Sequence, residues 1–184
     1  YDAVSNPVFY QYLRLLIFNE IIPGLELQDS GTAGVQTLAR NVLDRFSNPF
    51  IIHEWLQICT QSSRKIAGRG VPVMLNYIKR NKKIPPLMTA AFAGHFLLTK
   101  ERQQQNEKLP AASKIKDDFA DYYSDCWNEM PVGQAINAIL SNQSIWGTDL
   151  SKADDFAARI NYDITSITRD GIHLFLRELV AKQS

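Results

Sequence analysis

Apolar residues recur three and four positions apart along most of this 184-residue chain. In the clearest case the recurring residues are Val35, Leu38, Ala39, Val42, Leu43 and Phe46. This spacing places apolar side chains on one face of an α-helix, whereas a strand needs alternation with a period of two, which no segment sustains between turn signals. The pattern therefore predicts an all-α, multi-helical domain of about eight or nine helices with no essential sheet.

Prolines and capping residues predict where the helices begin and end. Asn6-Pro7 is an N-cap followed by proline at the first helical position, and the helix that it opens should end before Pro23. Ser47-Asn48-Pro49 should open a third helix that runs to about Ala67, because the residue before a proline avoids the helical region. A shorter helix should follow Gly70.

Further helices are predicted in the remaining part of the chain from Pro85-Pro86, over Asp117–Met130, from Pro131, over Phe156–Ile167 and beyond Gly171. The stretch Arg102–Lys114 is polar, glutamine-rich and contains a proline, so it is expected to form an exposed loop. Asp117 and Asp118 stand at a predicted helix start, where their charges complement the helix dipole.

The composition is that of a globular domain. Hydrophobic residues make up 45% of the chain and charged residues 21%, with 20 basic against 19 acidic side chains. Since there is no charge excess, nucleic acid is not an expected partner. The longest apolar run, Leu15–Phe18, is far too short to span a bilayer, and Cys59 and Cys126 suggest thiols in a reducing compartment. We therefore expect one cytoplasmic domain over residues 1–184, with no membrane partner.

No motif for catalysis, cofactor binding or metal binding occurs in the chain. It lacks a glycine-rich phosphate loop, a Gly-x-Ser-x-Gly elbow, His-Glu-x-x-His and Cys-x-x-Cys. Its histidines, His53, His95 and His173, fall on different predicted helices, and a lone helical histidine is more often a packing or surface residue than a ligand. No catalytic, cofactor-binding or metal-binding residue is therefore expected in this chain.

A concentration of polar residues between Asn48 and Arg69 is the best candidate for a binding site. On the helix predicted there, Lys65 and Arg69 lie four positions apart and share a face with Gln61. Ammonium and guanidinium groups bind carboxylates, and amides and hydroxyls satisfy sugar hydroxyls, so the cluster suits a polyhydroxylated anion. The alternative is a solvated basic helix end, which the helix dipole favours.

Several short stretches resemble one enzyme family. Arg45-Phe46-Ser47-Asn48-Pro49-Phe50-Ile51 is similar to the Arg-Phe-x-Asn-Pro-x-Ile signature in the C-terminal domain of the polyol-specific long-chain dehydrogenases. This family includes mannitol dehydrogenase, fructuronate reductase and tagaturonate reductase. Resemblance to the tagaturonate reductase branch is carried by His53, Ser62-Ser63-x-Lys65, Arg69-Gly70-Val71-Pro72, Ile115-Lys116-Asp117-Asp118 with Tyr123 and Trp127, and Phe18–Pro23.

The resemblance implies a two-domain enzyme in which a Rossmann-type NAD domain precedes a helical domain, with the active site between them. It also implies hydride transfer between NAD and a sugar acid, interconverting D-tagaturonate and D-altronate without a metal. The family's catalytic lysine belongs to a Lys-x-x-x-x-Asn-x-x-His motif, which is absent here, as is the Rossmann glycine fingerprint. We therefore expect the partner of this chain to be its own N-terminal NAD domain, and the chain alone to be inactive.

The same resemblance implies individual substrate-binding residues. Lys65 occupies the position of a substrate-contacting lysine, Asn48 lies in the signature turn, and His53 and Arg69 lie in stretches that carry the resemblance. Mannitol-type members have a substrate-binding arginine where this chain has Gln57, which argues against a mannitol-like substrate. The predicted substrate-binding residues are thus Lys65, Asn48, His53, Arg69 and Gln57.

Other functions remain open at this point. The chain could be the C-terminal domain of a fructuronate reductase or mannitol dehydrogenase, or a non-enzymatic helical interaction module. The upstream coding sequence separates the enzyme from the module, because a glycine-rich strand-turn-helix and the Lys-x-x-x-x-Asn-x-x-His motif would indicate the enzyme.

Overall fold

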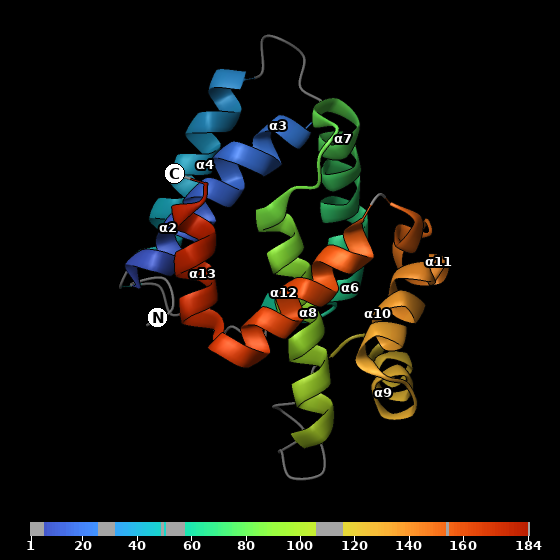
Figure 1. Cartoon of the computed structure of the whole chain (residues 1–184). Helices are drawn as coiled ribbons and strands as arrows, with labels where there is room; N and C mark the ends of the chain where they lie inside the picture. Colours follow the sequence, from blue (N-terminus) through green and yellow to red (C-terminus); the bar gives the residue numbers. More distant parts are fainter. Residues whose placement is uncertain are drawn as a thin grey trace. The chain divides into compact units, whose positions relative to one another are not determined.

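The computed structural model describes residues 6–25, 32–48, 50, 58–105, 116–153 and 155–183 (Figure 1). Within these ranges there are helices and turns but no strand, which confirms the prediction of an all-α fold. Counting each uninterrupted helical run once, the described residues form nine helices and one short 3₁₀ turn. Among the predicted site residues, His53 and Gln57 lie outside the described residues.

Contacts between Cα atoms divide the chain into two compact units. Unit 1 comprises Tyr1–His53, Pro72–Met88 and Ser166–Ser184, and unit 2 comprises Glu54–Val71 and Thr89–Thr165. The single domain over residues 1–184 stays a prediction.

The first helix of unit 1 begins as predicted but runs further. Asn6 Oδ1 accepts hydrogen bonds from the N–H of Val8 (2.9 Å) and of Phe9 (3.4 Å), which caps α2 (Pro7–Leu15). The helix continues through a π segment, η1 (Leu16–Ile21), into α3 (Ile22–Gly24), so the prediction that it ends before Pro23 was wrong. The wide π turn precedes the proline, where the ring and the missing N–H interrupt the regular α pattern.

The end of this helix packs closely against α7 (Val71–Asn81). A Cβ atom at Gly24 would collide with the backbone carbonyl and side chain of Val73, so only glycine fits this contact. Arg80 then donates two hydrogen bonds from Nη1, to Pro23 O (3.0 Å) and Leu25 O (2.8 Å). The guanidinium thereby satisfies carbonyl groups at the end of the helix.

A buried carboxylate joins the same helix to the start of α8 (Pro86–Gln105). Glu20 is only 1% exposed, and its Oε1 and Oε2 accept hydrogen bonds from Leu87 N (2.8 Å) and Met88 N (2.6 Å). Tyr12 donates its hydroxyl to Leu87 O at 3.0 Å. A carboxylate at a helix N-terminus is favoured both by the unpaired N–H groups and by the helix dipole.

The remaining helices of unit 1 agree with their apolar stripes. The stripe that ends at Phe46 forms α4 (Thr32–Phe46), and α13 (Ile172–Ala181) begins after Gly171 and packs along α2. Gly171 has φ +79°, a conformation that L side chains rarely adopt, which explains why glycine stands at this boundary.

The prediction of one helix from Ser47 to about Ala67 is wrong over residues 58–67, while its residues 49 and 51–57 lie outside the described residues. Cys59–Gln61 form a turn, and Gln61 has the left-handed conformation with φ +52°. A new helix starts at α6 (Ser62–Lys65), passes the two glycines as a π segment, η3 (Ile66–Gly70), and continues as α7. Glycine costs a helix about 1 kcal/mol relative to alanine, but tertiary context overrides so weak a preference.

The predicted loop over Arg102–Lys114 is also wrong in its first part, because α8 extends to Gln105. Glu, Arg and Gln are good helix formers, so a polar stretch that follows an established helix can prolong it. The rest of that predicted loop, residues 106–114, lies outside the described residues.

The helices of unit 2 surround an aromatic core. Besides α6, η3 and most of α8, they are α9 (Ala120–Glu129), α10 (Val132–Ser141), α11 (Gln143–Trp146) and most of α12 (Phe156–Asp170), with the 3₁₀ turn η5 (Leu150–Lys152) between the last two. The ring of Phe92 on α8 lies 5.3 Å from Phe156 and 5.9 Å from Trp146 between centroids, and Trp146 Nε1 donates to Ile139 O at 2.7 Å. This packing fills the core and satisfies the indole donor.

Candidate functional site

The candidate site is built where two stretches distant in the sequence meet in unit 2. Residues 116–118, which precede α9, lie against the turn that precedes α6. The N–H of Gln61 donates to Lys116 O at 2.6 Å, and Gln61 Nε2 donates to Asp118 Oδ1 at 2.7 Å. These bonds hold Gln61 in its left-handed conformation, so the helix begins at Ser62.

Asp117 caps the N-terminus of α6, although it lies more than 50 positions away in the sequence. Its Oδ2 accepts hydrogen bonds from Ser63 N (2.8 Å) and Ser62 Oγ (3.3 Å), and its Oδ1 accepts from Phe119 N (3.1 Å). The same carboxylate therefore serves the first turn of α6 and the turn that leads into α9. This placement fits the general preference of helix N-termini for acidic groups.

Asp118 makes the exposed contacts between residues 116–118 and the start of α6. It forms an ion pair with Arg64, and its pKa lies below the usual value because of the hydrogen bonds from Gln61 and Arg64. Arg64 and Asp118 are both solvent-accessible, so this pair contributes less to stability than its short contact suggests.

A buried pair of hydroxyl groups lies behind the Asp117 cap. Ser63 is fully buried, Tyr123 is 2% exposed, and their hydroxyl oxygens are 2.6 Å apart. Burial raises the pKa of Tyr123, so its phenol stays protonated and can donate. Tyr123 thereby ties the first turn of α6 to the middle of α9.

His95 on α8 completes this buried cluster. Its ring meets that of Tyr123 edge to face with centroids 5.9 Å apart, and burial lowers its pKa to about 4 although the negative charge of Asp117 opposes the shift. The imidazole is therefore neutral at pH 7. Within the described part of the chain, no hydrogen-bond partner reaches His95 Nε2.

Lys65 lies two residues beyond the buried Ser63 and is exposed. Its Nζ donates a hydrogen bond to Ile58 O at 2.9 Å, which folds the side chain back over the Cys59–Gln61 turn. A lysine ammonium carries three N–H donors, so two remain for a ligand. Arg69 is also exposed and lies in the π segment η3.

The predicted grouping of Gln61 with Lys65 and Arg69 on one helical face was wrong. Gln61 precedes the helix, and its amide bonds to Asp118. The sequence pattern could not show this break because the acceptor and the cap come from residues 116–118, more than 50 positions away.

Asn48 belongs to the other compact unit and has a local structural role there. Its Oδ1 accepts a hydrogen bond from Phe50 N at 2.9 Å, which closes an Asx turn over the signature, and the Phe50 side chain is 93% exposed. Its role in binding substrate stays a prediction, as do those of Lys65, Arg69, His53 and Gln57.

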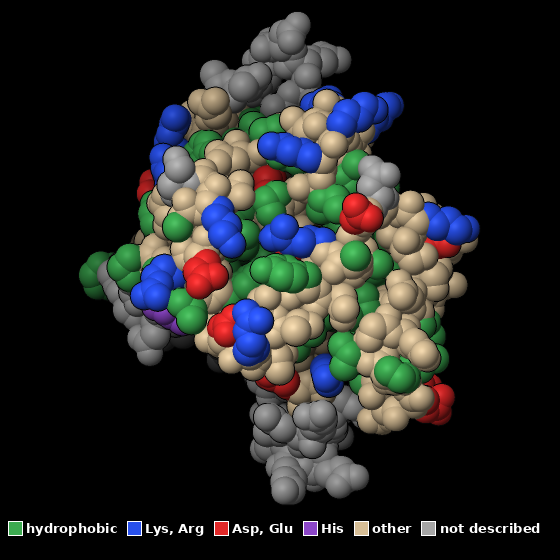
Figure 2. Space-filling view, viewed as in Figure 1, with side chains coloured by type: hydrophobic (Ala, Val, Ile, Leu, Met, Phe, Trp, Pro, Cys, Tyr) green, Lys and Arg blue, Asp and Glu red, His purple; other side chains and the backbone are tan. Residues whose placement is uncertain are grey.

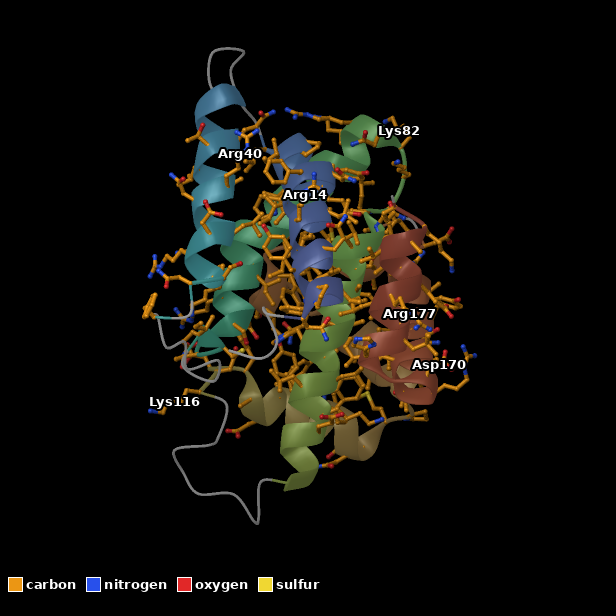
Figure 3. The ribbon with its side chains drawn as sticks, turned by 90° about the vertical axis from the view of Figure 1, so that its left-hand side faces the viewer. Arg14, Arg40, Lys82, Lys116, Asp170 and Arg177 are labelled. Carbon is orange, nitrogen blue, oxygen red and sulfur yellow. The ribbon has the colours of Figure 1, made fainter. Side chains whose placement is uncertain are left out.

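Unit 1 also contains a groove that the sequence did not predict. It has a volume of about 560 Å³ and is lined by Tyr10, Arg14, Phe18, Gln36, Arg40, Leu43 and Asp44. Figure 3 shows its two arginines, Arg14 on α2 and Arg40 on α4. Both side chains are exposed, and no predicted substrate-binding residue lines the groove.

Neither a membrane-spanning helix nor a cluster of metal ligands is found among the described residues. None of the described helices is both long enough and apolar enough to span a bilayer. Nor do the described His, Cys, Asp and Glu residues form a group of three suited to a metal ion. On the face drawn in Figure 2, Lys and Arg side chains occur singly or in small groups with acidic residues among them.

The chain matches one family model, and it is similar to relatives that share one name. A family model described as the mannitol dehydrogenase C-terminal domain matches residues 1–168. An altronate oxidoreductase of Pectobacterium atrosepticum is 26% identical over 179 residues, covering 93% of this chain and 36% of the relative. That of Yersinia enterocolitica is 28% identical over 169 residues, covering 88% and 33%. The chain therefore spans about a third of the length of these relatives.

A solved structure shows the same fold. The Pseudomonas fluorescens mannitol 2-dehydrogenase, in a ternary complex with NAD and D-mannitol, superposes with a TM-score of 0.78 and 20% sequence identity. The match covers 97% of this chain and 35% of that protein. At this identity the likeness concerns the helical architecture.

Proposed function

The chain belongs to the mannitol dehydrogenase C-terminal domain family, as the sequence resemblance predicted, and from this we propose that it is the substrate-side domain of a cytoplasmic altronate oxidoreductase. In the intact protein the reaction is the interconversion of D-tagaturonate and D-altronate with NAD. The observation that carries the proposal is the match to relatives of that name over 93% of the chain.

The arrangement around α6 supports a role in binding a sugar acid. Lys65 and Arg69 are exposed cations on one short run of helix, and a π segment, a feature frequent at functional sites, lies between Lys65 and α7. Charge-assisted hydrogen bonds from such cations favour a carboxylate-bearing ligand. We propose that Lys65 contacts the substrate and that Arg69, Asn48, His53 and Gln57 contribute to its recognition.

The described residues do not fit the nicotinamide cofactor. Binding of its pyrophosphate in this type of enzyme needs a strand, a glycine-rich turn and a helix, whereas the described part of the chain is helical and the sequence has no Gly-x-Gly-x-x-Gly. We therefore assign NAD and the catalytic lysine to an N-terminal domain, in the part of the relatives that this chain does not span, and expect no metal.

Kinetics of the full-length protein test this function. NADH oxidation followed at 340 nm should show the highest kcat/KM with D-tagaturonate, and lower values with D-fructuronate and D-fructose. A clear preference for fructuronate or fructose would instead indicate a fructuronate reductase or a mannitol dehydrogenase. An intact protein that oxidises NADH with none of these substrates would support the non-enzymatic module.

A further inference from the structure

We propose that Asp117 and Tyr123 are positioning residues, which fix the first turn of α6 and thereby hold the Lys65 ammonium where it meets the sugar acid. The inference rests on the proposed function, since it deepens the role of Lys65 in that function. Neither residue is proposed to touch substrate.

The first observation is that the helix carrying Lys65 has no cap from the residue that precedes it. Its first turn, α6, lies between the left-handed Gln61 and the π segment η3. The N-terminal N–H groups of a helix lack intrahelical partners, and Gln61 supplies no side-chain cap. The Asp117 carboxylate takes this place, with bonds to Ser63 N and Ser62 Oγ.

The second observation is that the opposite side of the same turn is anchored in the interior. Ser63 is fully buried and hydrogen-bonded to the equally buried Tyr123. Residues two apart on a helix point about 200° away from each other. Burying Ser63 on the Tyr123 side therefore turns Lys65 outward, in agreement with its exposure.

The third observation is that the Lys65 ammonium is hydrogen-bonded to the carbonyl group just before the turn that leads into α6. Its acceptor, Ile58 O, lies just before the Cys59–Gln61 turn, and Gln61 is fastened to Lys116 and Asp118. Lys116, labelled in Figure 3, is itself exposed and contributes through its backbone carbonyl. Loss of the Asp117 cap would therefore loosen both the helix that carries Lys65 and the turn next to its acceptor, Ile58 O.

A double-mutant cycle in the full-length enzyme separates positioning from general stability. Asp117→Ala should lower kcat/KM for D-tagaturonate about ten-fold, mainly through KM, and Tyr123→Phe about three-fold, because a side chain that only orients a binding group weakens substrate binding. In a Lys65→Ala background the same changes should have almost no further kinetic effect, since coupled residues are not additive. Losses that multiply in the double variants would overturn the proposal.

Controls separate the positioning role from effects on folding and from the role proposed for Lys65. Asp121→Ala removes an exposed carboxylate from α9 and should leave kcat/KM unchanged. Asp117→Asn retains one acceptor oxygen and should restore part of the loss even if Asp117→Ala folds poorly. If Lys65→Ala alone has no kinetic effect, the role proposed for Lys65 fails and the positioning role fails with it. A loss in Lys65→Ala that multiplies with the Asp117→Ala loss overturns the positioning role alone.

Discussion

The hydroxyl oxygens of Ser63 and Tyr123 lie 2.6 Å apart in the interior, although 60 positions separate the two residues in the sequence. This bond joins two stretches that each carry the family resemblance, Ser62-Ser63-x-Lys65 and Lys116-Asp117-Asp118 with Tyr123. A motif that consists of separate pieces in the sequence is thus one structural unit, and the candidate substrate lysine stands at its surface.

Replacing Lys65 by alanine in the full-length enzyme should lower kcat/KM for D-tagaturonate about ten- to a hundred-fold. The change removes a charge-assisted hydrogen bond worth roughly 1.5–3 kcal/mol to a bound anion. Because Lys65 is exposed, the melting temperature should change little. Steady-state kinetics and a thermal melt of the same variant check both points, with Lys182→Ala as the control for an exposed lysine elsewhere. An unchanged kcat/KM would remove Lys65 from the site.

The isolated chain should bind no NADH and oxidise none in the presence of D-tagaturonate. The reason is that it contains neither the strand-turn-helix phosphate site nor the Lys-x-x-x-x-Asn-x-x-His motif. Titration by calorimetry or by nicotinamide fluorescence measures this directly, with the full-length protein as the positive control. Saturable NADH binding by the chain alone would show that this assignment of the cofactor is incorrect.

Glu20→Ala should destabilise the protein by about 3 kcal/mol, because it leaves the buried N–H groups of Leu87 and Met88 without their acceptor. Glu20→Gln keeps one acceptor oxygen and should cost less. Urea unfolding of both variants measures the difference in free energy. Glu178→Ala, which removes an exposed glutamate from α13, serves as the control and should be nearly neutral.

His95→Gln should remove a pH-dependent contribution of this residue to the free energy of unfolding. Burial lowers the pKa of His95 from 6.5 to about 4 in the folded protein, so the unfolded chain binds more protons between these values. The wild type therefore loses up to roughly 3 kcal/mol from this residue as pH falls from 6.5 to 4. Urea unfolding at several pH values in this range should show that loss in the wild type relative to the variant. Parallel profiles would indicate that His95 is not buried in its neutral form.

Asp163→Asn should remove a contribution to the free energy of unfolding whose pH dependence is opposite to that of His95. Burial raises the pKa of Asp163 to about 6 although Arg159, whose Nε lies 2.9 Å from Oδ1, favours the charged form. The folded protein then binds more protons between pH 4 and 6, so this residue makes stability fall by roughly 2 kcal/mol as pH rises through that range.

The same urea series distinguishes the two residues. Stability should fall with rising pH in His95→Gln, where the Asp163 term remains, and rise with pH in Asp163→Asn, where the His95 term remains. A slope of the wrong sign in His95→Gln would contradict the burial of a neutral Asp163 carboxyl group.

The sequence by itself determined the helices whose signals are local. The stripe of α4, the Asn6 cap of α2, the start of α10 after Pro131 and the break at Gly171 all depend on residues within a few positions of each other. Periodicity and capping act over one or two turns, so they can be recognised without knowing the neighbours. The family resemblance was likewise carried by short stretches and was confirmed by the match over residues 1–168.

Only the tertiary structure decided where the helix with Lys65 begins. The turn at Cys59–Gln61 exists because Lys116, Asp117 and Asp118 supply its acceptor, cap and amide partner, and no local pattern announces bonds from more than 50 positions away. The same holds for Ser63, a polar residue on a predicted amphipathic helix, which is buried because Tyr123 satisfies its hydroxyl. Burial of a polar group is decided by the partner that it finds, and that partner is chosen by the fold.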